Sequence, residues 1–141
     1  MATTSTYKLP VAPPELGGNK PVIVEYFLDI ADTGTITASD IVEMLDCLTD
    51  IAVLAGGYEI ITPFTATVTI EVGKAGGTEL STAIVADAAA GTKGVFTFTG
   101  PCVLFATDTV DAQILVANAA AGHIRFWFLV ADVSRNIGAT V

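Results

Sequence analysis

The sequence predicts an all-β fold: a single β-sandwich or jelly-roll-like domain with an extended, proline-rich N-terminal arm. Short runs rich in Val, Ile, Thr, Phe and Tyr recur along the chain, separated by Gly, Asp, Pro or Asn. This is the pattern of many short strands joined by turns. The length of 141 residues suits one domain, which can bury a core without disulfide bonds or metal ions.

The arm is predicted for residues 1–20, and the sandwich domain for residues 21–141. Pro10, Pro13 and Pro14 precede a pair of glycines at positions 17 and 18. They exclude a helix or a central strand, because proline fixes φ and has no amide donor. The stretch is therefore expected to be extended, and it could either be disordered or reach a neighbouring subunit.

From residue 21 onward the pattern is that of strands. The Ala-rich segment 81–94 is predicted as a loop at the rim of a sheet, because Gly91 and Gly94 would end any helical turn quickly. The predicted strands are residues 21–30, 58–64, 65–72, 95–101, 102–106, 111–117 and 124–133.

The segment at residues 36–51 has two readings. Its apolar residues, among them Ile41, Leu45 and Leu48, fit a helical stripe, and Ser39 or Asp40 could cap the start. Periodicity alone therefore favours a short helix. The alternative is a buried strand that turns at residues 49–50 into the run 51–57, and short apolar runs do not decide between the two.

The last predicted strand is largely apolar on both faces. One face would carry Ile124, Phe126, Phe128 and Val130, and the other Arg125, Trp127, Leu129 and Ala131. Such a strand must be covered twice, by a second sheet and by something else, for which we expect another copy of the chain. The predicted oligomer interface comprises Trp127, Arg125, Leu129, Phe126 and Phe128.

Composition excludes several classes of function. Charged residues make up 15% of the chain, apolar residues 52%, and the mean hydropathy is +0.64, so surplus apolar surface for protein contacts is expected. The six basic residues are scattered and the net charge is −9, which disfavours a nucleic-acid partner. No run reaches the roughly 18 apolar residues of a membrane span, and no secretory signal is evident. We expect a soluble protein made in the cytosol.

Candidate chemical sites have simpler structural explanations. His123 is the only histidine, so any Ser-His-Asp or Cys-His arrangement would need it, and a structural or interface role is favoured. Asp108 and Asp111, or Asp29 and Asp32, could offer oxygen ligands to calcium, yet neither pair has the alternating spacing of an EF-hand. Turn formation and solvated strand ends are favoured instead. No metal, cofactor or enzymatic activity is predicted.

The remaining motifs also indicate structure. Cys47 and Cys102 lie in apolar runs and are too far apart for a C-x-x-C motif, so small reduced core residues are expected. The glycine-rich stretch 73–80 lacks the Walker spacing, because Lys74 precedes the paired glycines. We expect a hairpin turn there.

The order of strand motifs resembles a family of small tailed-phage virion proteins encoded beside the major capsid protein. The resemblance covers roughly residues 35–134 and leaves the arm unmatched. The matching positions are Gly57, Glu59, Ile61 and Thr62; Thr67 to Gly73; Ala106 and Asp108 to Asp111; and Gly122, Ile124, Arg125, Phe126 and Trp127. It favours a strand over a helix for residues 40–48.

The resemblance implies a capsid decoration, or cement, protein that stabilises the outer surface of a phage head, often as a trimer. Its partners would be the major capsid protein and its own copies, and Pro10, Pro13, Pro14 and Leu16 of the arm are the expected capsid contacts. The alternative is a receptor- or carbohydrate-binding module of a phage fibre or head fibre. Such modules present exposed aromatic residues, of which this chain has one Trp and three Tyr to offer.

Overall fold

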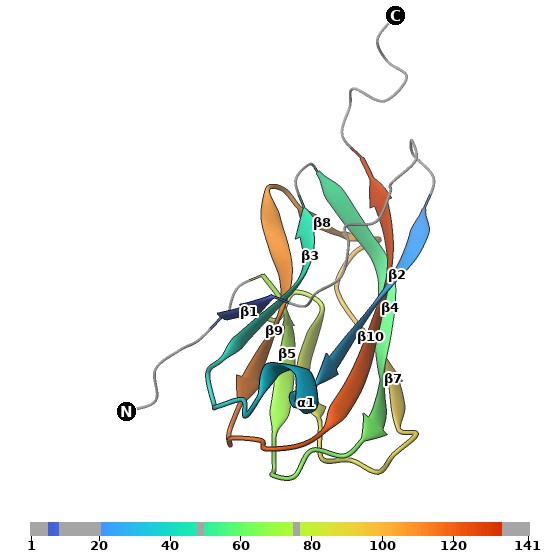
Figure 1. The fold of residues 1–141 in the computed structure, drawn as a ribbon. Helices are drawn as coiled ribbons and strands as arrows, with labels where there is room; N and C mark the ends of the chain where they lie inside the picture. Colours follow the sequence, from blue (N-terminus) through green and yellow to red (C-terminus); the bar gives the residue numbers. More distant parts are fainter. Residues whose placement is uncertain (1–5, 9–20, 48–49, 75–76, 134–141) are drawn as a thin grey trace, which may run out of the picture.

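The computed structural model describes residues 6–8, 21–47, 50–74 and 77–133, and it shows two β-sheets packed face to face (Figure 1). One short helix accompanies the strands in this part of the chain. The elements are β1 (Thr6–Lys8), β2 (Val22–Asp29), α1 (Ile30–Thr33), β3 (Ile41–Cys47), β4 (Ile51–Thr62), β5 (Thr69–Gly73), β6 (Ser81–Val85), β7 (Lys93–Val95), β8 (Val103–Phe105), β9 (Asp108–Leu115) and β10 (His123–Asp132). The predicted all-β sandwich is confirmed.

The first sheet, sheet A, has the strand order β1-β3-β9-β5-β6. All its pairs are antiparallel except β1 with β3, which run parallel. Strand β1 falls inside the predicted arm, and these three residues form an edge strand of the sandwich. Tyr7 of this strand packs against the core. The predicted capsid contacts Pro10, Pro13, Pro14 and Leu16 lie outside the described residues.

The second sheet, sheet B, has the order β2-β10-β4-β7, and β8 pairs with the first part of β4. Strand β10 is central and pairs antiparallel with both β2 and β4. Segments about 100 residues apart in sequence therefore lie side by side, as Trp127 does with Glu25. Strand β2 forms one edge of the sheet.

The core fills the space between the sheets. Tyr26, Phe96 and Phe128 meet there, with ring centroids 6.1 Å apart for Tyr26 and Phe128 and 5.5 Å apart for Phe96 and Phe128. Sheet A contributes a smaller aliphatic layer that includes Ile70 and Ile114, both fully buried. Side chains from the two inner faces together form one close-packed core.

The segment that periodicity assigned to a helix is strand β3, as the resemblance favoured. The register between β3 and β9 shifts between Glu43 and Leu45, which is the signature of a β-bulge. The extra residue, Met44, is buried like its neighbour Leu45. Two adjacent buried residues break the period of two and imitate a helical stripe, which is why periodicity alone favoured a helix; the strand that the resemblance favours is confirmed.

The boundaries of other strands also differ between the prediction and the structure. Residues 81–85, predicted as part of a loop, form the edge strand β6. Strand β7 shares only Val95 with the predicted strand 95–101, and residues 96–101 form no strand. The glycine-rich stretch connects the antiparallel strands β5 and β6, as predicted for a hairpin. Within the described residues, no helix has the length and apolar character needed to cross a membrane.

Candidate functional site

The face of sheet B that points away from the core is the most distinctive surface of the described chain. Along β10, burial alternates strictly until Val130, so Arg125, Trp127 and Leu129 point outward and are partly exposed. Phe126 and Phe128 point inward and have no exposed surface. These two residues belong to the chain's own core, which corrects their place in the predicted interface: their rings have no area to offer a neighbour.

An ion network crosses this outer face. Arg125 donates from Nε to Glu25 Oε1 at 3.0 Å, and its Nη2 also donates to that oxygen. Its Nη1 lies 3.9 Å from Glu59 Oε1, and Lys93 Nζ lies 3.7 Å from Glu59 Oε2. The network joins β2, β10, β4 and β7, and its four formal charges sum to zero.

A cavity of about 410 Å³ opens beside this network, lined by Tyr58, Glu59, Lys93, Gly94, Val95, Arg125 and Trp127. Its shape depends on Gly57, which pairs with Trp127 in β10 and with Val95 in β7. A Cβ at Gly57 would lie 2.8 Å from Trp127 Nε1 and 3.0 Å from Cε2. The indole therefore lies against the bare backbone of Gly57, which only glycine permits.

A strip of apolar side chains runs along the β2 edge of the same face. Ile23 is 64% exposed and Phe27 is 45% exposed, and Leu129 lies directly opposite Ile23 in the register. We call Ile23, Phe27 and Leu129 the β2 stripe. Exposed apolar residues on an edge strand favour contact with another chain.

His123 lies at the start of β10 on the same face as Arg125. Its Nδ1 is 3.9 Å from Asp29 Oδ2, and its ring meets Phe27 edge-on at 5.7 Å. Asp29 also caps α1, because its side chain accepts a hydrogen bond from the backbone N–H of Ala31 at 3.0 Å. A structural role for His123 stays a prediction, and these contacts place its imidazole against Phe27 and Asp29 of β2.

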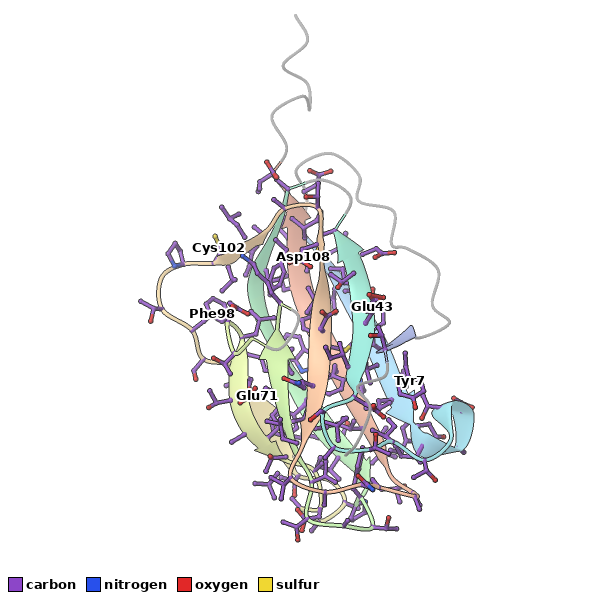
Figure 2. All side chains as sticks on the ribbon, turned by 90° about the vertical axis from the view of Figure 1, so that its left-hand side faces the viewer. Tyr7, Glu43, Glu71, Phe98, Cys102 and Asp108 are labelled. Atoms are coloured by element: carbon purple, nitrogen blue, oxygen red, sulfur yellow. The ribbon has the colours of Figure 1, made fainter. Side chains whose placement is uncertain are left out.

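The outer face of sheet A is acidic, and Figure 2 looks onto it, with Glu43, Glu71 and Asp108 labelled. Asp111 lies in the same row, opposite Glu43, and is only 2% exposed. Its pKa is raised to about 6, mainly by burial and to a smaller extent by the neighbouring acidic side chains, while a hydrogen bond with Thr109 opposes the shift. A buried neutral carboxyl here would avoid repulsion from the nearby carboxylates.

The two Asp pairs weighed as oxygen ligands, Asp108 with Asp111 and Asp29 with Asp32, belong to no larger cluster of ligands in the described residues. Within the described ranges, no group of three or more His, Cys, Asp or Glu side chains has an arrangement that could hold a metal ion. Both cysteines are free: Cys47 is buried, as predicted for a core residue, whereas Cys102 is only partly buried. Burial, followed by nearby carboxylates, raises the pKa of the Cys47 thiol to about 12, so this thiol is not an activated nucleophile.

Several residues on the outer face of sheet B were not identified as site residues from the sequence. The β2 stripe could have been inferred in part, because Ile23 and Phe27 alternate with buried residues in β2. The partners of Arg125 could not, since Glu25 and Glu59 become neighbours only through strand pairing.

Comparison with known proteins gives a likeness of fold. No protein-family model and no curated protein matches the sequence. Among solved structures, a chain of the Cyanophage Pam1 capsid asymmetric unit is similar with a TM-score of 0.60 and 24% identity, covering 86% of this chain and 91% of that chain. A chain of the capsid of Ralstonia phage GP4 is similar with a TM-score of 0.65 and 14% identity, covering 92% and 99%. The described sandwich therefore has the fold of chains found in two phage capsids.

Proposed function

We propose that the chain is a virion structural protein: a decoration, or cement, protein that binds the outer surface of a phage head. The observation that carries this proposal is the likeness to two capsid chains, which extends over almost the whole length of each partner. Fold alone does not fix a role, but the strand motifs that resemble phage decoration proteins lead to the same role. The partners would be the major capsid protein and copies of this chain. The protein would be made in the host cytoplasm, with no need for nucleic acid, membrane or catalytic residues.

The β2 stripe is the surface proposed to join copies of the chain. Its exposed side chains offer apolar area, and the adjoining Arg125–Glu25 pair offers a polar rim. An apolar centre with a polar rim is the usual composition of protein interfaces. We expect a homotrimer, because three copies around a local three-fold axis of a head would each contact several capsid subunits and bind with avidity.

The test combines solution mass with head binding. Light scattering after size-exclusion chromatography should give a trimer, and Ile23→Glu with Phe27→Glu should give a monomer. Val85→Glu is a matched control, because Val85 is an exposed apolar residue on the edge strand β6 of the other sheet. The wild-type protein should co-sediment with undecorated heads of the cognate major capsid protein and raise their melting temperature. Absence of binding to such heads would refute the decoration role.

A further inference from the structure

We propose that the cavity beside Trp127 is a binding site for a neutral saccharide. The cavity has a volume of about 410 Å³ and is formed by β10, β4 and β7 of sheet B. This size falls within the range of small-molecule sites, which are typically apolar with a few placed polar groups. Nothing in the proposed decoration role requires such a cavity.

The indole of Trp127 supplies the apolar wall. One part of the ring lies against Gly57, and the side chain lines the cavity together with Val95, which is 69% exposed. A sugar ring has a C–H face that packs well against an indole, and a tryptophan in such a position also keeps a polar N–H.

The charged rim determines what kind of ligand fits. Arg125, Glu59 and Lys93 line the cavity, and Glu25 completes the chain of ion pairs. Hydroxyl groups can accept hydrogen bonds from the two cations and donate them to the carboxylates without breaking a pair. An apolar side chain would desolvate these charges without replacing their hydrogen bonds, which is costly.

Charge balance excludes a strongly charged ligand as the best occupant. The two carboxylates and two cations of the rim compensate one another, so an acidic ligand would meet Glu59 and a cationic ligand would meet Arg125 and Lys93. A neutral molecule with an apolar face and a hydroxylated edge can pack against the indole and also form hydrogen bonds with the charged rim. Neutral saccharides have this combination.

The site adjoins the surface proposed for assembly, because the Arg125–Glu25 pair lies at the rim of both. The exposed apolar residues Ile23 and Phe27 lie on β2, on one side of β10, whereas the cavity extends to β4 and β7 on the other side. Copies joined through Ile23 and Phe27 would therefore leave the β7 side of the cavity open. Failure of saccharide binding would leave head binding untouched, and the glutamate substitutions in the β2 stripe should abolish the trimer while saccharide binding persists.

The test uses the only tryptophan of the chain as its own reporter. The intact protein is titrated with neutral oligosaccharides built from glucose, galactose, mannose or N-acetylglucosamine, and with an oligogalacturonate as the acidic comparison, while the Trp127 fluorescence is followed. We expect a saturable change with at least one neutral series. Glu59→Gln should weaken binding about tenfold, because a charge-assisted hydrogen bond is lost, and Val85→Ala should leave it unchanged.

Binding to Trp127→Ala is followed by calorimetry, since this variant has no indole, and should be at least tenfold weaker. Three results would overturn the proposal: no binding in any neutral series, equal or tighter binding of the oligogalacturonate, or neutral binding that survives both Trp127→Ala and Glu59→Gln. The Glu59→Gln variant keeps the test decisive if Trp127→Ala does not fold.

Discussion

Replacing Gly57 by alanine is predicted to destabilise the sandwich and to displace the indole of Trp127. The added Cβ would meet Trp127 Nε1 at 2.8 Å and would collide with the carbonyl oxygen of Gly94. The indole can rotate away, but the Gly94 oxygen is backbone of β7, so β7 must shift from β4. Overpacking of this kind costs about 1–3 kcal/mol. For a domain of this size, the melting temperature should fall by about 4–12 °C.

The assay is thermal unfolding followed by circular dichroism, together with the emission of the single tryptophan at low temperature. A displaced indole should be more exposed to water and emit at longer wavelength. Gly34→Ala is the control: Gly34 has φ of +75°, and no atom lies within 4 Å of the position that a Cβ would take there. This substitution therefore adds backbone strain of about 1–3 kcal/mol, because φ of +75° with ψ of −178° is a region that glycine almost alone adopts, but it does not reach the indole. The emission of Trp127 therefore separates the two variants even where both lower the melting temperature. An unchanged emission spectrum and an unchanged melting temperature for Gly57→Ala would refute the placement of Trp127 over Gly57.

Three further predictions concern the core and the buried titrating groups. Phe128→Ala should lower the free energy of unfolding by about 3–5 kcal/mol in urea titrations, because its fully buried ring contacts two aromatic neighbours; a loss below about 1 kcal/mol would contradict the core described above. The folded pKa of Asp111, about 6, lies above its ordinary value of 3.8, so the native state holds a proton that the unfolded chain has released. Stability should therefore fall as pH rises from about 4 to about 6, by at most about 3 kcal/mol, and Asp111→Asn should flatten this part of the pH profile; an equal slope in the variant would disprove the assignment. Cys47, with its pKa raised to about 12, should resist alkylation near pH 8 until the protein unfolds, whereas Cys102 should react in the native protein; rapid modification of both thiols in the native protein would show that Cys47 is accessible.

The sequence predicted the face that each residue of β10 presents, because a regular strand alternates with a period of two. It did not predict that Phe126 and Phe128 would be the residues buried in the chain's own core, since both faces of the strand are apolar in the sequence. The distinction depends on which face meets sheet A, and that is decided by the fold as a whole. The structure assigns this role to the face with Phe126 and Phe128, whose rings pack in the core.

Two other features of the structure could not be predicted from the sequence. A β-bulge after Glu43 made strand β3 resemble a helix in its hydrophobic spacing, and no property of the single sequence distinguishes the two patterns. The cavity beside Trp127 could not be predicted from the sequence either, because it depends on Gly57 of β4 lying opposite Val95 of β7. Pairing of distant segments, rather than local propensity, creates this site.

The central claim, that the chain decorates a phage head, is tested most directly by adding the purified protein to undecorated heads of the cognate major capsid protein. We predict saturable co-sedimentation with the heads, a higher head melting temperature, and weaker binding for the monomeric Ile23→Glu/Phe27→Glu variant, because avidity would be lost. Heads that neither retain the protein nor gain thermal stability would contradict the claim.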